Sequence, residues 1–210
     1  MQKLTVLVDM DDTIELLTDA WLEWLNDRHG TAVTKDDIES WDFAAAFPTL
    51  TREEAYAPIY IDEFWDRVEP FPLAYEILCR LRAEGHEIYI VTSSAYQTLP
   101  AKMEKVLFRY FPFLDWDHVI VAAKKQMILG DVLIDDAPHN LEGFEGLKIL
   151  MNAPHNRTYD ARQNGMFRVS DWQTIYDLIR HYSRICETRE IARKLAYYRA
   201  RRREGKGETL

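Results

Sequence analysis

Continuous apolar runs and helical stripes of apolar residues alternate along most of the chain. The runs predict five strands, at residues 4–8, 86–91, 119–122, 132–134 and 148–151. Apolar residues three and four positions apart predict five helices, at residues 18–29, 73–84, 100–110, 140–144 and 172–182. This alternation favours an α/β fold with a doubly wound parallel sheet and helices on both of its faces.

Residues 15–70 interrupt this alternation, since they are rich in aromatic and acidic residues and contain no long apolar run. The sequence Thr51-Arg52-Glu53-Glu54 has the pattern of a capping box, which predicts that a helix begins there. We therefore expect a small helical cap inserted after the first strand. The α/β core then consists of residues 1–14 and 71–185.

Residues 186–210 are predicted to form a basic C-terminal helix and tail. From Arg189 to Leu210 the chain has eight Lys or Arg and three Asp or Glu, so the net charge of −9 divides into +5 here and −14 elsewhere. Ile191, Leu195 and Tyr198 lie at helical spacing. We expect this helix to pack on the body with its basic side solvated or facing the acidic surface. Docking to nucleic acid or to another partner is the alternative.

Composition excludes several classes of protein. No apolar run approaches the roughly 18 residues of a membrane span, and the first apolar run leads into acids instead of a signal-peptide cleavage site. The acidic body argues against nucleic acid as its partner. Two cysteines without a CxxC pattern favour a reduced, cytoplasmic protein.

Four of the predicted strands end in polar side chains, which are Asp9 and Asp11, Thr92 and Ser93, Lys125, and Asp135 and Asp136. A buried strand does not tolerate unpaired carboxylates, so the acids belong at the carboxyl edge of the sheet, where open α/β folds bind ligands. Carboxylates that meet at such an edge form a site for a hard cation. We expect this cation to be Mg²⁺.

These side chains fit the steps of phosphoryl transfer. Asp9 can act as the nucleophile and form an aspartyl-phosphate. Asp11 can protonate the leaving alkoxide and later deprotonate the hydrolytic water. The hydroxyl of Thr92 or Ser93 can hold the non-bridging phosphate oxygens.

The remaining strand-end residues can balance the charge. Lys125 can neutralise the phosphate and the nucleophile together, while its neighbour Lys124 is expected at the surface. Asp135 can complete the Mg²⁺ shell with Asp9, and Asp136 can act through a bound water. Without the cation and the lysine, the clustered carboxylates would repel one another and the phosphate.

The ordered set of motifs resembles that of the haloacid dehalogenase-like phosphatases. These motifs are Asp9-x-Asp11-x-Thr13, Thr92-Ser93, Lys125 and Asp135-Asp136. A narrower resemblance, to the 5′(3′)-deoxyribonucleotidase family, rests on Asp9-Met10-Asp11, Trp65 before Glu69-Pro70-Phe71-Pro72, Val91-Thr92-Ser93-Ser94, Asp131-Val132-Leu133-Ile134-Asp135-Asp136 and His155-Asn156. It implies a Rossmann-like core with a small helical cap, and dephosphorylation of nucleoside monophosphates with deoxypyrimidines preferred. It also implies that the Asp11 carbonyl is a metal ligand and that the protein forms a homodimer.

The chain departs from this family at two positions near the first motif. Asp12 stands where the vertebrate enzymes resemble DMDG, and Leu17 stands where they place a base-stacking Phe. Both departures concern the preference for base and sugar and leave the catalytic residues in place.

The cap aromatics Trp41, Phe43, Phe64 and Trp65 form either a nucleobase pocket or the cap's own small core. Trp65 and Phe43 are the best candidates for contact with the base. Lys102, near the start of its helix, either touches phosphate or lies on a solvated face. The six histidines show no ligand spacing and are expected to be structural or at the surface.

The sequence thus predicts a Mg²⁺-dependent phosphomonoesterase acting on nucleoside monophosphates, with deoxyribonucleotides preferred. One alternative within the same chemistry is a phosphatase for another small ester or for a nucleic-acid 3′ end. A second alternative, of another class, is a nucleotide-binding regulator with low turnover.

Overall fold

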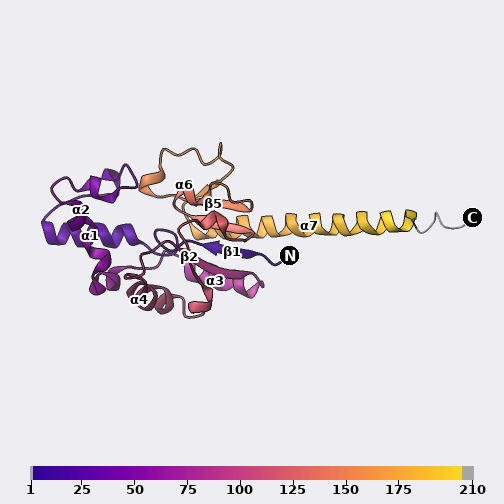
Figure 1. Ribbon diagram of the computed structural model, residues 1–210, viewed down its shortest axis with the longest axis horizontal. Coiled ribbons are helices and arrows are strands. Elements are labelled where there is room, and N and C mark those ends of the chain that lie inside the picture. Colours follow the sequence, from indigo (N-terminus) through magenta and orange to yellow (C-terminus); the bar gives the residue numbers. More distant parts are fainter. Residues whose placement is uncertain (1, 205–210) are drawn as a thin grey trace, which may run out of the picture.

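Six parallel strands form one sheet in the computed structural model, which describes residues 2–204 and the side chains of residues 2–196 (Figure 1). The strands are β1 (Thr5–Val8), β2 (Glu87–Thr92), β3 (Val119–Val121), β4 (Val132–Asp135), β5 (Leu147–Met151) and β6 (Phe167–Val169). Their order is β3-β2-β1-β4-β5-β6, and every neighbouring pair is parallel. The predicted α/β fold class is confirmed.

The two central strands, β1 and β4, are apolar because both of their faces are covered. Leu7 of β1 pairs with Leu133 of β4 on one side and with Tyr89 of β2 on the other. From β1 the sheet therefore grows in both directions, and a crevice opens beyond the carboxyl ends of β1 and β4. The strand-end acids lie at this crevice.

Alternate residues of the strands enter two separate cores. Val6, Val8 and Ile134 belong to a large core, which also contains residues of α3 (Ala74–Ala83) and α7 (Trp172–Glu204). Leu7 and Leu133 belong to a smaller core. That face is covered by the short helix α6 (Pro138–Leu141) and an irregular segment around residues 159–166, instead of by a long helix.

Residues 15–70, which we name the cap segment, are helical as expected, and the helical residues are divided between α-helices and short 3₁₀ turns. The segment contains the helices α1 (Leu17–His29) and α2 (Arg52–Tyr56) and the 3₁₀ turns η1 (Lys35–Asp37), η2 (Phe43–Ala46), η3 (Ala57–Tyr60) and η4 (Asp62–Arg67). The predicted capping box at Thr51 and Glu54 is present. The segment lies beyond the carboxyl ends of the strands, where α1 and α2 appear at the left of Figure 1.

The helix predicted after β2 is one helical stretch in three parts. It runs through α4 (Leu99–Lys102), a π-helical turn η5 (Met103–Leu107) and α5 (Phe108–Tyr110). The remaining 3₁₀ turns, η6 (Trp116–His118), η7 (Lys125–Met127) and η8 (Pro154–Asn156), lie in connections between strands.

The structure differs from two other expectations. The helix expected at residues 140–144 ends earlier, at Leu141, and β6 has too few residues for its pattern to be recognised.

The expectation that the C-terminal helix packs on the body is wrong. Helix α7 continues to Glu204 and extends away from the body, toward the right of Figure 1. Ile191 and Leu195 are 53% and 52% exposed. The Tyr198 side chain and residues 205–210 lie outside the part of the chain described. Among the described helices, none has the length and apolarity needed to cross a bilayer.

Candidate active site

Lys125 joins the ends of β1 and β4. Its ammonium bonds to the Asp9 carboxylate and lies 2.7 Å from Asp135 Oδ2, and all three side chains are buried. Asp135 also accepts bonds from the Ala137 amide at 2.8 Å and from the Asn140 side chain at 3.0 and 3.1 Å. Two strand ends far apart in sequence therefore share the ammonium of Lys125. The sequence analysis expected Lys125 beside Asp9 but did not foresee its contact with Asp135. Lys124 is exposed, also as expected.

Asp136 is held through its backbone. Its carbonyl accepts bonds from the Asn156 side chain at 2.7 Å and from the His155 ring at 3.1 Å. Arg168 of β6 in turn donates to Asn156 Oδ1 at 2.6 Å. Strand β6, which the sequence analysis did not predict, thus supports the loop that positions Asp136.

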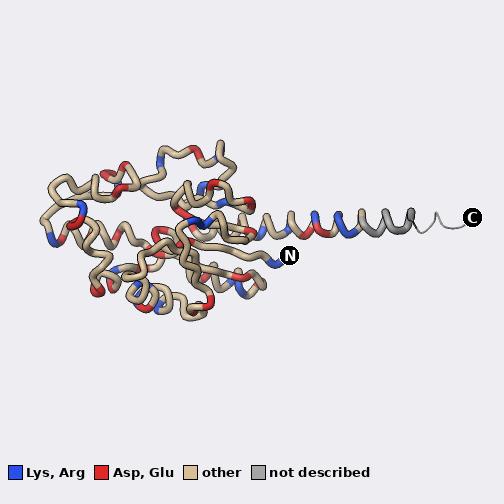
Figure 2. The backbone as a smooth tube through the Cα atoms, viewed as in Figure 1, with Lys and Arg blue, Asp and Glu red and all other residues tan. Residues whose placement is uncertain are grey.

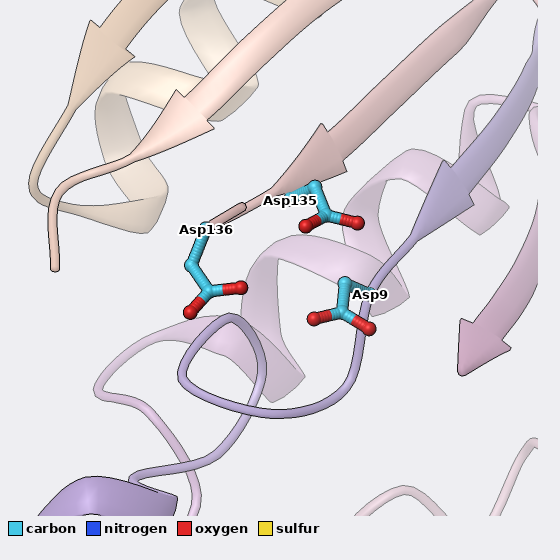
Figure 3. Close-up of side chains that lie close together, drawn as sticks. All are labelled: Asp9, Asp135 and Asp136. Atoms are coloured by element: carbon cyan, nitrogen blue, oxygen red, sulfur yellow. The ribbon is translucent and has the colours of Figure 1, made fainter. Parts of the chain in front are cut away.

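The carboxylates of Asp9, Asp135 and Asp136 converge (Figure 3), each with an oxygen within 4.8 Å of the others. All three are buried. Burial raises the pKa of Asp9 to about 7, against the opposing attraction of Lys125, and burial also raises the pKa of Asp136 well above 3.8. The single ammonium of Lys125 therefore does not balance the charge of these three carboxylates. A hard, oxygen-binding divalent cation fits such a donor set.

Asp11 is paired with Lys102 from α4. The ammonium lies 2.6 Å from each carboxylate oxygen of Asp11, and Lys102 is 1% exposed. Burial works to raise the pKa of Asp11, but Lys102 and the neighbouring Glu15 outweigh it, and this pKa is lowered. The alternative that placed Lys102 on a solvated face is therefore wrong. The helical pattern could not show that this face of α4 turns toward the acids.

The two hydroxyls after β2 have different surroundings. Thr92 is fully buried, and its Oγ1 lies 2.7 Å from Ser94 Oγ and 3.2 Å from the Lys102 ammonium. Ser93 is exposed and lines the cavity described below, whereas Thr92 does not. Of the two predicted phosphate contacts, the structure thus opens Ser93 to the cavity and encloses Thr92 behind Ser94.

Glu15 is an acid that the sequence analysis passed over. It is completely buried, and neither carboxylate oxygen has a hydrogen-bond partner among the described residues. Burial raises the pKa of Glu15 well above 4.5, and the adjacent Asp11 carboxylate adds to the effect. Both effects favour the neutral form of Glu15, and a neutral carboxyl can donate to Asp11.

The backbone and the hydrogen bonds of Asp12 explain why Asp can stand where the family pattern DMDG has Gly. Its backbone is left-handed, with φ of 51°, a conformation that favours Gly and that Asp tolerates better than most residues. Its carboxylate accepts bonds from the Thr18 amide at 2.9 Å and the Thr18 hydroxyl at 2.6 Å. The side chain thus fixes the first turn of α1 to the loop that carries Asp9 and Asp11.

A cavity of about 340 Å³ lies between these acids and the cap segment. Asp9, Asp11, Ser93, Lys102, Lys125 and Asp136 lie along its polar part. The predicted Leu17, Phe43 and Trp65 line its apolar part, together with Trp21, Ile38, Tyr56 and Ile59, which the sequence did not single out. The chain therefore encloses one space that is charged at one end and aromatic at the other.

Some aromatic residues of the cap segment form a core, and some of these also line the cavity. Phe43 stacks on Trp21 with ring centroids 4.4 Å apart, and Trp65 meets the edge of Phe64 at 5.3 Å. Phe64 is fully buried and does not line the cavity, so it belongs to the core alone. Phe43 and Trp65 are at once part of this core and a wall of the cavity.

Trp41 contacts two histidines of the core across the cavity. Its ring meets the edges of His155 at 4.5 Å and His139 at 5.4 Å, and all three residues line the cavity. Trp41 itself is 59% exposed. His139 is exposed, as expected for a surface residue, and His155 is half-buried against the Asp136 carbonyl. The sequence analysis did not show that both would line the cavity.

Comparisons with known proteins agree with this geometry. Residues 3–185 match the family described as 5′ nucleotidase, deoxy (pyrimidine), cytosolic type C protein (NT5C). A 5′(3′)-deoxyribonucleotidase of Bacillus subtilis is 33% identical over 175 residues, which cover 82% of this chain and 96% of the relative. One from Clostridium acetobutylicum is 30% identical over 172 residues, covering 82% and 92%.

Solved structures share the fold at low sequence identity. A haloacid dehalogenase-like hydrolase from Streptococcus pneumoniae has a TM-score of 0.60 at 12% identity, covering 84% of this chain and 98% of its own. The Bacillus subtilis HAD-hydrolase YfnB, solved with bound magnesium, has a TM-score of 0.55 at 13% identity, covering 85% and 99%. These structures show that the chain has the fold of haloacid dehalogenase-like hydrolases. Since the family match spans most of the sequence and includes all of the strand-end motifs, the chain belongs to the NT5C family of 5′(3′)-deoxyribonucleotidases.

Proposed function

We propose that this chain is a Mg²⁺-dependent phosphomonoesterase that hydrolyses nucleoside monophosphates, with deoxyribonucleotides preferred. Family membership supports the reaction and the substrate class. The observation that carries the proposal is the bridge from Lys125 to Asp9 and Asp135, with Asp136 beside it, at the charged end of an aromatic cavity. A nucleoside monophosphate has a matching shape, with a phosphate dianion at one end and a flat aromatic base at the other.

In this mechanism the Asp9 carboxylate attacks the phosphorus, and the ester oxygen leaves with a proton from Asp11. The Lys125 ammonium offsets the charge of Asp9 during the approach of the phosphate. In the second step Asp11 takes a proton from the water that hydrolyses the aspartyl-phosphate. The lowered pKa of Asp11, caused by Lys102 and Glu15 against the effect of burial, favours the carboxylate that this step uses and disfavours the protonated form that the first step uses.

Asp9, Asp135 and Asp136 are proposed to hold the Mg²⁺, together with the Asp11 carbonyl that the family resemblance implies. When bound, the ion supplies positive charge that lets several carboxylates and a phosphate occupy one site. Ser93 and Lys102, which line the same end of the cavity, are proposed to hold the phosphate oxygens. Thr92 is proposed to support them through Ser94 and Lys102.

The apolar end of the cavity is proposed to hold the base and the sugar. Leu17, Phe43 and Trp65 line it, and residues 15–70 are proposed to act as a cap over the core comprising residues 1–14 and 71–185. A flat base fits between aromatic walls, and the cap excludes water from the reacting phosphate. Motion of the cap is then expected to gate entry and release.

The variant Asp9→Asn tests the nucleophile. Phosphate release should fall by at least about a thousandfold, because an amide cannot form the acyl phosphate. Thermal unfolding should stay at or above the wild-type temperature, since burial already disfavours the charged form of Asp9. The exposed Asp117→Asn is the matched control and should retain full activity. A wild-type rate in Asp9→Asn would show that another group attacks.

A substrate panel separates the proposal from its alternatives. Phosphate release is measured from ribo- and deoxyribonucleoside 5′- and 3′-monophosphates, sugar phosphates and a 3′-phosphorylated oligonucleotide, with and without Mg²⁺. Higher rates on deoxyribonucleoside monophosphates with Mg²⁺ support the proposal. Higher rates on sugar phosphates or on the oligonucleotide indicate one of the other phosphatases. Nucleotide-dependent thermal stabilisation without phosphate release indicates a binding regulator.

We also propose a cytoplasmic location and a homodimer. Two free, partly buried cysteines, Cys79 and Cys186, support a reducing compartment. The dimer rests on the family resemblance, and sedimentation velocity of the purified chain tests it.

A further inference from the structure

Helix α7 has two parts with different surroundings. Its first part packs on the body, where Trp172, Ile175, Ile179 and Ser183 are completely buried. Its described side chains from Ile191 to Ala196 are all exposed, although Ile191 and Leu195 are apolar. The helix therefore continues beyond the body, and we name residues 186–204 the α7 extension.

The α7 extension lies outside the part of the chain that its family shares. The family match ends at residue 185, close to the point where α7 leaves the body. The Bacillus subtilis relative is matched over 96% of its own length, while 82% of this chain is used. All of the strand-end motifs therefore lie within the part of the chain shared with the family, and the family match assigns no role to the extension.

Charge separates the extension from the body. The sequence from Arg189 to Leu210 carries +5 against −14 for the rest of the chain. Basic residues of the described part, shown blue in Figure 2, stand on the rod beyond the body. At 1.5 Å per residue the extension is about 28 Å long, whereas charges are screened within about 8 Å at physiological ionic strength. Of the described basic residues of the extension, Lys194 pairs with Glu190 at 2.6 Å, whereas Arg189 and Arg193 are exposed.

We propose that the α7 extension is a docking surface for the phosphodiester backbone of nucleic acid. A rod with repeated Lys and Arg matches a polymer that has one charge in every few ångströms. Its distance from the acidic body removes the repulsion that otherwise keeps the polymer away. Figure 1 shows the extension and the cap segment at opposite ends of the molecule, so a polymer docked on the extension leaves the cavity open.

Two other occupants fit less well. In a second copy of this chain, pairing of the two extensions would bring two net charges of +4 together. Several acids of the cap segment already have basic partners. Examples are Asp19 with Lys35 at 2.7 Å and Asp27 with Arg67 at 2.8 Å. A membrane-binding helix needs a broad apolar face. The described part of the extension offers large apolar side chains only at Ile191 and Leu195.

The test compares two triple variants of the full chain that change the net charge equally. Arg189→Glu/Arg193→Glu/Lys194→Glu reverses three exposed charges of the extension. Arg28→Glu/Arg109→Glu/Arg162→Glu reverses three exposed charges of the body. Binding to a fluorescein-labelled oligo(dT) of 30 nucleotides is measured by anisotropy between 50 and 200 mM salt, and hydrolysis of a nucleoside monophosphate is measured in parallel.

The wild type should bind the oligonucleotide, with an affinity that falls by about a hundredfold over this salt range if four to five phosphates are contacted. The extension variant should lower the affinity at 50 mM salt by at least tenfold and reduce the salt slope by about two. The body variant should bind like the wild type, and both variants should hydrolyse the monophosphate normally. Mononucleotide hydrolysis thus reports separately on the proposed function.

Three results would overturn the proposal. The first is the absence of oligonucleotide binding by the wild type. The second is equal loss of binding in the two triple variants, which would show that only net charge matters. The third is that the extension variant instead loses binding to vesicles of phosphatidylserine and phosphatidylcholine, or loses self-association in sedimentation velocity. Either loss assigns the extension to that other occupant.

Discussion

Replacement of Lys102 by methionine tests how the site holds its proposed general acid. The ammonium is 1% exposed and lies 2.6 Å from both oxygens of Asp11, 2.5 Å from Ser94 Oγ and 3.2 Å from Thr92 Oγ1. Methionine keeps much of the length of the side chain but removes the charge. Asp11 would then be a carboxylate in a protein interior without its cation.

The structure sets the size of the effect. Removal of one partner of a buried ion pair costs about 3–5 kcal/mol. The Asp11 side chain is 34% exposed, so water can solvate part of its charge, and we expect the low end of the range, about 3 kcal/mol. For a chain of this size that corresponds to a fall in Tm of about 6–12 °C.

Urea and thermal unfolding at pH 7 measure the loss, with Lys124→Met as the control. Lys124 is the exposed lysine beside the site, and its variant should stay within about 0.5 kcal/mol of the wild type. The pKa of Asp11 lies below its ordinary value of 3.8, so the pair stabilises the fold above that pH. As the pH falls through the lowered pKa, the difference between wild type and Lys102→Met should disappear.

The double variant Lys102→Met/Asp11→Asn decides whether the unpaired charge is the cause. It should be more stable than Lys102→Met alone, because no carboxylate remains to be compensated. If Lys102→Met unfolds within 0.5 kcal/mol of the wild type, or if Asp11→Asn adds to its loss, the reasoning about this pair is wrong.

Three further predictions concern other parts of the chain. Glu15→Gln should be more stable than the wild type by a margin that grows from pH 5 to pH 8. Because the pKa of Glu15 is raised in the folded state, the wild-type fold loses stability as the pH rises above 4.5. Equal margins in thermal unfolding at pH 5 and pH 8 would contradict this. Gly146→Ala should cost about 1–3 kcal/mol in urea unfolding, because a Cβ there would collide with the Asp131 carbonyl oxygen; wild-type stability would contradict it. Trp41→Ala should raise KM for nucleoside monophosphates roughly tenfold and leave kcat unchanged, since Trp41 lines the cavity without reaching the acids. Steady-state kinetics measure both constants, and a fall in kcat alone would contradict the prediction.

The strands and their chemistry could be predicted because their signals are local. The apolar run that ends in Asp9 and the run that ends in Asp135 each identify a buried strand and its exit from the core. Parallel pairing then requires both acids to meet at one edge, and β1 and β4 are indeed neighbours. The roles proposed for these acids remain predictions.

Other features of the site could not be predicted, because they depend on which face of an element meets which neighbour. Lys102 has the sequence context of a solvated helical lysine, yet α4 turns it toward Asp11. His139 and His155 have no ligand spacing, and both contact Trp41 because the segments after β4 and β5 adjoin. The apolar stripe of α7 looked like a packing face, although the body ends before Ile191.

By itself, the sequence determined the parallel sheet, the acids at its carboxyl edge and the family. Burial disfavours an unpaired charge within a central strand, and the spacing of residues can be seen without coordinates. Only the tertiary structure decided which cation serves which carboxylate, which hydroxyl faces the cavity and where the C-terminal helix goes. These depend on distances between segments remote in sequence, because an ion pair or a cavity wall exists only where packing brings its two sides together.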